Sequence, residues 1–146
     1  MNRGILAIKN CFVQSVVWKG KKLTAEKMFH NVLFALKQKA SVTPISIFYY
    51  AILKLRPVLG LKSIKDNHRP VKFPFPIKEK KKRLLAIKFL LASAKDKQQK
   101  INFIKVGDLL YEIYSGKHNL AMQKKYKLYS EIRDNRMFLR RNFTLK

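Results

Sequence analysis

Lysine and arginine side chains gather in four short clusters along the chain. The clusters are Lys19–Lys22, the cations from Lys62 to Lys72, the run Lys80–Arg83, and the arginines at positions 136, 140 and 141. Such cations form charge-assisted hydrogen bonds to phosphate groups. One basic run is usually only solvated surface, but four runs in 146 residues extend too far for a single small phosphate compound. The pattern therefore favours a long, phosphate-rich polymer as the ligand.

The overall balance of charge points the same way. The chain has 33 Lys and Arg against 8 Asp and Glu, a formal net charge of +25 at pH 7. A polyphosphate relieves this self-repulsion and releases its own condensed counterions when it is bound. Nucleic acid is therefore the first candidate partner, and an anionic membrane surface is the second. No apolar run approaches the roughly 18 residues of a membrane span, so no membrane insertion is expected.

Residues for catalysis or metal binding are few and scattered. The histidines His30, His68 and His118 lie far apart, and no metal-ligand spacing occurs, so we expect no metal, no cofactor and no small-molecule substrate. Asp108 and Glu112 stand one helical turn apart and could form a catalytic pair, as in an RNA-modifying enzyme. Ion pairing with neighbouring lysines is the favoured interpretation, because like charges at this spacing repel each other. The sequence thus predicts a protein that is not an enzyme.

Three further side chains allow two interpretations each. Cys11 is the only cysteine, which excludes an internal disulfide, and its place beside Phe12 on an apolar stripe favours a thiol packed in the core over a reactive one. Tyr126 and Tyr129 alternate with lysines, as in surfaces that stack on nucleic-acid bases. Their helical spacing nevertheless favours core packing.

Six helices are predicted to position these side chains, in a mainly α fold. The first runs from Ile5 to Val17 and is ended by Gly20, and the second has Thr24 as its N-cap. The third begins at Pro44, after the capping Thr43, and stops before Pro57. Each of these boundaries rests on a residue whose backbone chemistry starts or stops a helix.

The other three helices come after a segment in which the spacing of apolar residues changes from helical to alternating. The fourth carries the run Lys80–Arg83 in its first turn and has Leu84 on its buried face. The fifth spans residues 103–115, with Gly107 marking close packing and Gly116 in the C-terminal capping position. The last begins near Asn119. Cations in the first turn oppose the helix dipole by about 0.3–1 kcal/mol each, so the fourth helix favours phosphate contacts there.

Alternating apolar residues predict a β-hairpin at about 58–78, between the third and fourth helices. Its polar tip spans residues 65–69, and Pro74 and Pro76 confine the second strand to an edge, because proline nitrogen donates no hydrogen bond. The hairpin should protrude from the helical body. The whole chain, 1–146, is expected to form a single domain with a basic C-terminal tail at 139–146.

Several short motifs, taken in order, resemble the family of small-subunit ribosomal protein seven. They are Gly20-Lys21-Lys22 before a helix, Ala51-Ile52 followed by Arg56-Pro57-Val58, Gly60-Leu61-Lys62-Ser63, the stretch Lys82 to Leu90 with Ala94-Lys95 after it, Val106 to Ile113, and Met122 to Phe138 with Asn135 and Arg136 retained. The resemblance covers about nine-tenths of the chain. It departs from the family in a nearly absent N-terminal arm and in the hairpin tip, Asp66-Asn67-His68.

The resemblance implies a helical fold with a protruding hairpin that binds the 3′ major domain of small-subunit RNA and nucleates assembly of the head. It also implies neighbouring head proteins, and transfer RNA and messenger RNA near the exit site, as partners. With the basic clusters, it predicts ribosomal RNA contacts at Lys19, Lys21, Lys22, Lys62, Lys65, Arg69, Lys72, Lys80, Lys81, Lys82, Arg83, Lys88, Lys124, Lys125, Arg140 and Arg141. Exit-site contacts are predicted at Lys62, His68, Arg69 and Arg136.

Amino-acid usage gives an expectation about the compartment. Of the 33 cations 25 are lysines, and Ile, Phe, Tyr and Asn are plentiful, which are residues with A- and T-rich codons. Together with the shortened N-terminus, this bias favours a mitochondrial ribosome. A plastid or a bacterial cytoplasm is the alternative.

Overall fold

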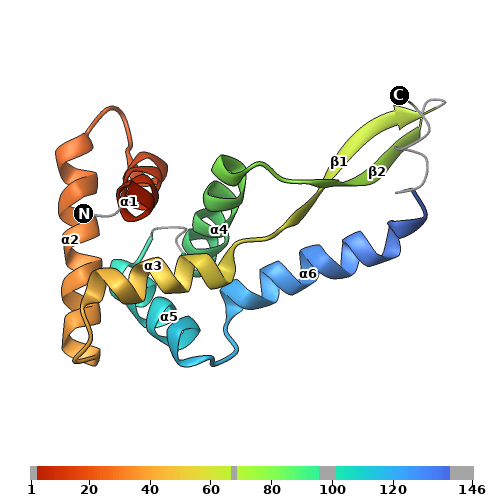
Figure 1. Cartoon of the computed structure of the whole chain (residues 1–146). Helices are drawn as coiled ribbons and strands as arrows, with labels where there is room; N and C mark the ends of the chain where they lie inside the picture. The colour runs from red at the N-terminus through yellow and green to blue at the C-terminus, as the bar shows by residue number, and fades with distance from the viewer. Residues whose placement is uncertain (1–2, 67–68, 96–100, 139–146) are drawn as a thin grey trace.

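The computed structural model describes residues 3–66, 69–95 and 101–138, and the statements below concern these residues. Six helices and one hairpin follow in order, as Figure 1 shows. They are α1 (Arg3–Val16), α2 (Lys22–Lys39), α3 (Pro44–Leu55), β1 (Leu59–Asp66), β2 (Arg69–Pro76), α4 (Glu79–Ser93), α5 (Phe103–Ser115), α6 (Leu120–Asp134) and the short 3-10 turn η1 (Arg136–Phe138). The predicted mainly α fold with one hairpin is confirmed.

Helices α1 to α5 form a body around one apolar core. Phe12, Phe29 and Phe48 meet at its centre, where their ring centroids lie 5.2–5.6 Å apart. Edge-to-face packing of this kind adds to the stabilisation from buried area. Every fully buried large side chain among the described residues is apolar, so no charge is withdrawn from the surface into the core.

Helices α2 and α5 pack closely because Gly107 has no side chain. A Cβ atom on Gly107 would lie 3.0 Å from the Cβ of Ala35 on α2. Helix α5 begins at Phe103 after the capping Asn102 and ends at Gly116, whose φ of 83° is left-handed. The predicted bounds of this helix, its capping glycine and the close approach at Gly107 are all confirmed.

The hairpin and α6 extend from the body as an arm, with α6 running along the hairpin (Figure 1). The strands pair antiparallel from Leu59 with Pro76 to Asp66 with Arg69, so the predicted protruding hairpin is confirmed. At the base of the arm the Tyr129 hydroxyl accepts a hydrogen bond from the Val58 backbone N–H at 3.1 Å. Lys72 on β2 pairs with Glu131 on α6 at 3.5 Å. These contacts hold the two parts of the arm together.

The junction of α1 and α2 differs from its prediction. Helix α1 ends at Val16 rather than at Gly20, and α2 begins at Lys22 with Lys21 as N-cap, so Thr24 lies inside the helix. The cause is a turn at Lys19 and Gly20, which both have positive φ, of 48° and 76°. Helical bonding starts directly after this turn, because the Ala25 N–H already donates to the Lys21 carbonyl.

Two predictions about buried side chains are wrong. Leu84 is 36% exposed, because the buried face of α4 runs through Ala86, Ile87 and Leu90 instead. Tyr126 is 47% exposed rather than packed in the core, because much of α6 extends beyond the body. Tyr129 is half-buried, in the contact to Val58 described above.

In the described part of the chain, no helix combines the length and the apolar character needed to span a membrane.

Candidate nucleic-acid interface

Helix α4 begins with an unusual concentration of positive charge. Its N-cap is Lys78, no side chain caps the first turn, and Lys80–Arg83 follow the single acidic residue there, Glu79. Helices α5 and α6 begin differently, since Asn102 and Asn119 accept hydrogen bonds from the first backbone N–H groups. An uncapped helix start carries partial positive charge, and cations there add to it. The start of α4 is therefore suited to bind an anion.

Helix α2 starts in the same way. Lys21 is its N-cap without a side-chain cap, and Lys19, Lys21 and Lys22 are all exposed. Only Lys22 of these three has an acidic neighbour among the described residues, Glu26 at 3.8 Å. In Figure 1 the turn before α2 and the start of α4 lie along one upper edge of the molecule, which continues into the hairpin.

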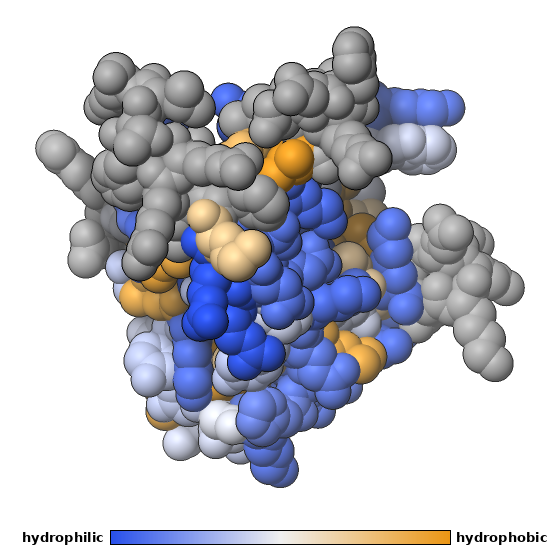
Figure 2. Space-filling model, turned by 90° about the vertical axis from the view of Figure 1, so that its right-hand side faces the viewer, coloured by the Kyte–Doolittle hydropathy of each residue, from blue (hydrophilic) through white to orange (hydrophobic). Residues whose placement is uncertain are grey.

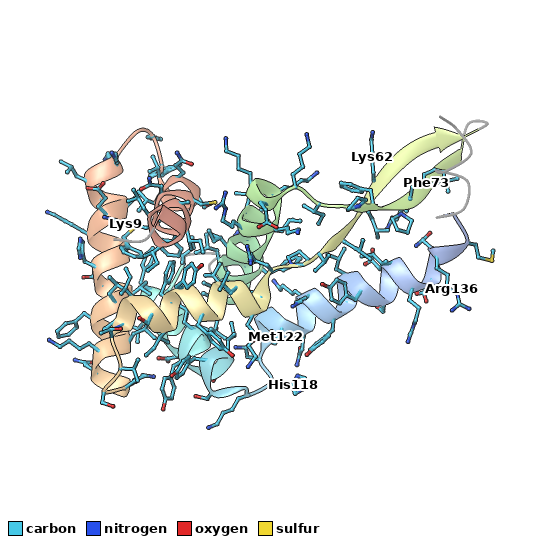
Figure 3. All side chains as sticks on the ribbon, viewed as in Figure 1. Lys9, Lys62, Phe73, His118, Met122 and Arg136 are labelled. Atoms are coloured by element: carbon cyan, nitrogen blue, oxygen red, sulfur yellow. The ribbon has the colours of Figure 1, made fainter. Side chains whose placement is uncertain are left out.

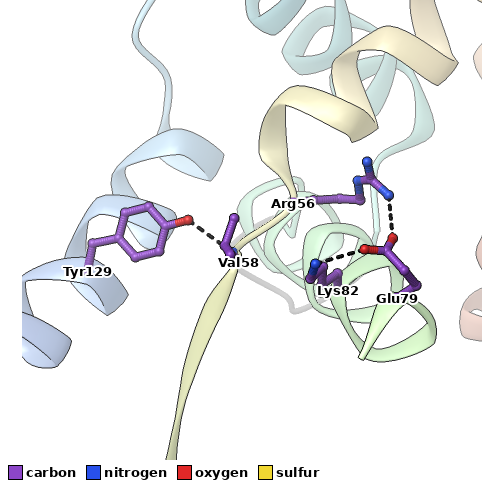
Figure 4. A network of polar contacts seen from close by, with 5 residues as sticks. All are labelled: Arg56, Val58, Glu79, Lys82 and Tyr129. Atoms are coloured by element: carbon purple, nitrogen blue, oxygen red, sulfur yellow. Dashed lines mark hydrogen bonds and ion pairs between the residues drawn. The ribbon is translucent and has the colours of Figure 1, made fainter. Parts of the chain in front are cut away.

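A small ion-pair network fixes the start of α4 to the rest of the body (Figure 4). Glu79 accepts from Arg56 at 2.8 Å and from Lys82 at 2.7 Å. The hydrogen bond from Lys82 is the main reason that the pKa of Glu79 is lowered. Part of the Lys82 charge is thus balanced, whereas the described acidic side chains form no ion pair with Lys80, Lys81 or Arg83.

One groove joins cations that are far apart in the sequence. We call it the hairpin–helix groove; it has a volume of about 450 Å³ and lies between the hairpin, α4 and α6. Leu61, Phe75, Leu85, Phe89 and Leu128 are among the apolar residues that line it, and Lys72, Lys81, Lys124 and Lys127 bring positive charge to it. Three of these lysines were predicted to bind RNA. Lys127 was missed, although it follows Lys124 by one helical turn.

A second groove lies where α1 packs against the start of α4. We call it the α1–α4 groove; its lining residues are Ala7, Asn10, Cys11, Gln14, Lys80, Lys81, Arg83 and Leu84. Lys81 contributes to both grooves, so the two lie on either side of one basic helix start. Asn10 and Gln14 were not among the predicted contacts, since neither residue type signals phosphate binding.

Lys125 differs from the other predicted lysines. Its ammonium group donates to the Lys54 carbonyl at 2.6 Å and lies 5.8 Å from the centre of the Tyr129 ring. Burial lowers the pKa of Lys125. This charge connects α6 to the end of α3 inside the protein, and it is therefore left out of the RNA contacts proposed below.

The remaining predicted contacts lie on the arm, on α4 or outside the described residues. Lys62 on β1, Lys88 on α4 and Arg136 in η1 are exposed, and Figure 3 labels Lys62 and Arg136 on the two sides of the arm. The side chains of Lys65 and Arg69 fall outside the described part of the structure, and so do the whole residues His68, Arg140 and Arg141.

The acidic and thiol groups have structural surroundings. Asp108 pairs with Lys39 on α2, which confirms ion pairing for this carboxylate. Cys11 is partly buried against the core, and burial raises the pKa of its thiol, as expected for a packed cysteine. Among the residues that the structure describes, no group of three His, Cys, Asp or Glu could hold a metal ion.

Figure 2 looks at the molecule from the side of the arm. Hydrophilic side chains cover most of the described surface on this face, and apolar ones appear only as separated spots. Such a surface suits a hydrated, charged ligand better than a lipid bilayer, for which a basic helix presents a continuous apolar face. On this face, the described surface therefore favours nucleic acid over the membrane alternative.

Comparison with known proteins decides the family. The family model described as ribosomal protein S7p/S5e matches residues 6–134. The chain belongs to this family. Membership in a family of structural ribosomal proteins bears out the predicted resemblance, and with it the prediction that the protein is not an enzyme.

Relatives from bacteria and from mitochondria both match. The small ribosomal subunit protein uS7 of Pseudothermotoga lettingae is 27% identical over 126 residues, which cover 86% of this chain and 81% of that protein. The protein uS7m of Reclinomonas americana is 30% identical over 129 residues, covering 87% and 79%. The uS7m of Schizosaccharomyces pombe is 31% identical over 88 residues, covering 60% and 34%. Sequence identity to these relatives therefore does not distinguish a bacterial from a mitochondrial ribosome.

The lowered pKa of Glu79 leads to a prediction about pH. A carboxyl whose pKa is lower in the folded state stabilises the fold above its usual pKa of 4.5, and this stabilisation is lost as the pH falls through the folded value. Glu79→Gln should therefore lower the urea midpoint of unfolding at pH 7. At a pH well below the lowered pKa, where Glu79 is protonated in the folded and the unfolded state alike, variant and wild type should converge. A difference that is equally large at both pH values would contradict the ion-pair network.

Proposed function

We propose that this protein is a structural component of the small ribosomal subunit and that it binds small-subunit ribosomal RNA. The observation that carries the proposal is the basic edge formed by the starts of α2 and α4 and by the hairpin. Family membership supports it, because the relatives named above are small-subunit proteins. The work of the protein is then to fix folded RNA, not to catalyse a reaction.

The RNA contacts are proposed at the cations that project from this edge and line the two grooves. Lys80 and Lys81 stand foremost, because they are exposed at an uncapped helix start without an acidic partner among the described residues. Lys19, Lys21 and Lys22 form the second anchor, at the start of α2. Arg83, Lys88, Lys62, Lys72 and Lys124 complete the described set, with Lys82 as a contact that also keeps its bond to Glu79.

The family resemblance supports a finer proposal about the position in the ribosome. We infer that the RNA bound is the 3′ major domain, that binding nucleates assembly of the head with neighbouring head proteins, and that the arm lies near the exit-site transfer RNA and messenger RNA. Lys62 and Arg136 are the described residues proposed for the exit-site contacts. Both are exposed on the arm, which extends away from the body.

The basic edge leads to a prediction about salt dependence. Replacing both Lys80 and Lys81 with alanine should weaken binding to a transcript of the 3′ major domain. The slope of log binding constant against log salt should become shallower by roughly one unit per lost phosphate contact. Filter binding at several salt concentrations measures both effects.

The matched control removes the same charge elsewhere. Lys37 near the end of α2 and Lys117 after α5 are both exposed. In Figure 1 the end of α2 and the turn after α5 lie at the lower edge of the molecule, opposite the starts of α2 and α4. The double variant Lys37→Ala/Lys117→Ala should keep the wild-type slope. If the two double variants change the slope equally, net charge alone explains binding and the proposed edge is wrong.

For the compartment, we propose a mitochondrial ribosome. The supporting observation is the lysine-rich composition, in which amino acids encoded by A- and T-rich codons are plentiful. Tagged protein should then sediment with small-subunit particles from fractionated mitochondria and should shift to lighter fractions after ribonuclease treatment. Recovery only with plastid or cytoplasmic particles would overturn this assignment and leave the ribosomal role intact.

A further inference from the structure

The α1–α4 groove brings cationic and amide side chains together, a combination that we do not find elsewhere along the described basic edge. From α4 come the cations Lys80, Lys81 and Arg83, and from α1 come the amides of Asn10 and Gln14. The two amides stand one helical turn apart and therefore lie on one face of α1. Both are exposed, and within the described residues neither amide group donates or accepts a hydrogen bond. Their hydrogen-bonding capacity is available to a ligand.

Amides and cations recognise different parts of a nucleotide. An Asn or Gln amide presents one donor and one acceptor side by side, a pattern that matches the N6 and N7 edge of adenine. Lysine and arginine bind the phosphate and carry no sequence information by themselves. A groove with amides on one wall and cations on the other can therefore hold a base and its own phosphate together.

The apolar lining and the size of the groove agree with such a ligand. Ala7 from α1 and Leu84 from α4 supply apolar surface to the lining, and the exposure of Leu84, which the sequence did not predict, leaves its side chain open to a ligand. Arg83 is half-buried where α1 packs against α4. Its positive charge lowers the pKa of the Cys11 thiol, but burial raises that pKa by more. The volume, about 490 Å³, lies within the range of pockets that bind small ligands, roughly 300–1,000 Å³.

We propose that the α1–α4 groove binds an unpaired nucleotide of the ribosomal RNA, with adenine as the preferred base. Asn10 and Gln14 hydrogen-bond to the base edge, and Lys80, Lys81 and Arg83 hold its phosphate. The base has to be unpaired because the hydrogen-bonding edges of RNA bases are accessible mainly in loops, bulges and single strands. This proposal rests on the proposed RNA-binding function and adds a specificity-determining site to it.

Removing the amides tests specificity separately from charge. Asn10→Ala/Gln14→Ala should bind the 3′ major domain transcript about tenfold more weakly, because a bidentate base contact discriminates by this order. Its affinity for poly(U) and its salt slope should stay at wild-type values, since no cation is lost. The matched control is Asn31→Ala/Gln38→Ala, which removes the same two groups from exposed positions on α2 and should leave both affinities unchanged.

Cys11 provides a direct probe of the same groove. It is the only cysteine in the chain and lines the groove beside the amides, so the wild-type protein reports on occupancy without a new label site. Alkylation of its thiol should slow in proportion to the fraction of protein bound to the transcript. Poly(U) bound to the same extent should protect less, and adenosine monophosphate alone should not protect, because it lacks the contacts of the remaining RNA.

The outcomes separate this inference from the proposed function. If the transcript binds tightly but Cys11 is alkylated at the free rate, RNA lies elsewhere and the groove proposal fails alone. The proposal is also overturned if Asn10→Ala/Gln14→Ala loses affinity for the transcript and for poly(U) equally. Protection of Cys11 by adenosine monophosphate, with no protection by RNA, would overturn it as well. If wild type binds no RNA, the proposed function itself fails.

Discussion

Repulsion among the positive charges on its surface is the main constraint on this structure. A net charge of +25 lies on a fold of 146 residues whose core is apolar, and only 8 Asp and Glu are available to balance 33 Lys and Arg. The five ion pairs of the described residues involve four carboxylates, and Glu79 serves two of these pairs. The charge that remains needs an external anion. A polyphosphate that follows the basic edge supplies many negative charges at once.

The helices place these charges where an anion gains most. At the starts of α5 and α6 an asparagine caps the backbone, while at the starts of α2 and α4 lysines take its place. The second arrangement destabilises the isolated helix, because cations oppose its dipole, and the penalty is removed when phosphate binds. Folding and binding therefore place opposite demands on the same residues. The apolar core, with its three packed phenylalanines, stabilises the fold enough to permit this.

Local signals explain what could be predicted from the sequence. Pro44, Pro57, Asn119 and Gly116 each set a helix end through their own backbone chemistry, and alternation set the hairpin. The junction of α1 and α2 was missed because Lys19 adopts a positive φ that its residue type does not favour. The inward role of Lys125 was missed for a different reason. It depends on the Lys54 carbonyl, which lies 71 residues away in the chain and near it only in the folded protein.

The same distinction applies to the interface. Clusters of cations are visible in sequence, so the polyanionic ligand and the importance of Lys80–Arg83 could be inferred directly. The two grooves could not, because each is built from helices or strands that only tertiary packing brings together. Asn10 and Gln14 gain significance only beside α4. Sequence thus indicated the class of ligand, and the fold indicated where a base and its phosphate could be bound.

The most direct test of this account is the thermal unfolding of the full chain at low salt, with and without small-subunit ribosomal RNA. If unbalanced cations destabilise the free protein, added salt alone should raise its Tm, and the RNA should raise it further at the lowest salt concentration. A Tm that neither salt nor RNA changes would contradict the claim that the fold is held together against its own charge until RNA neutralises it.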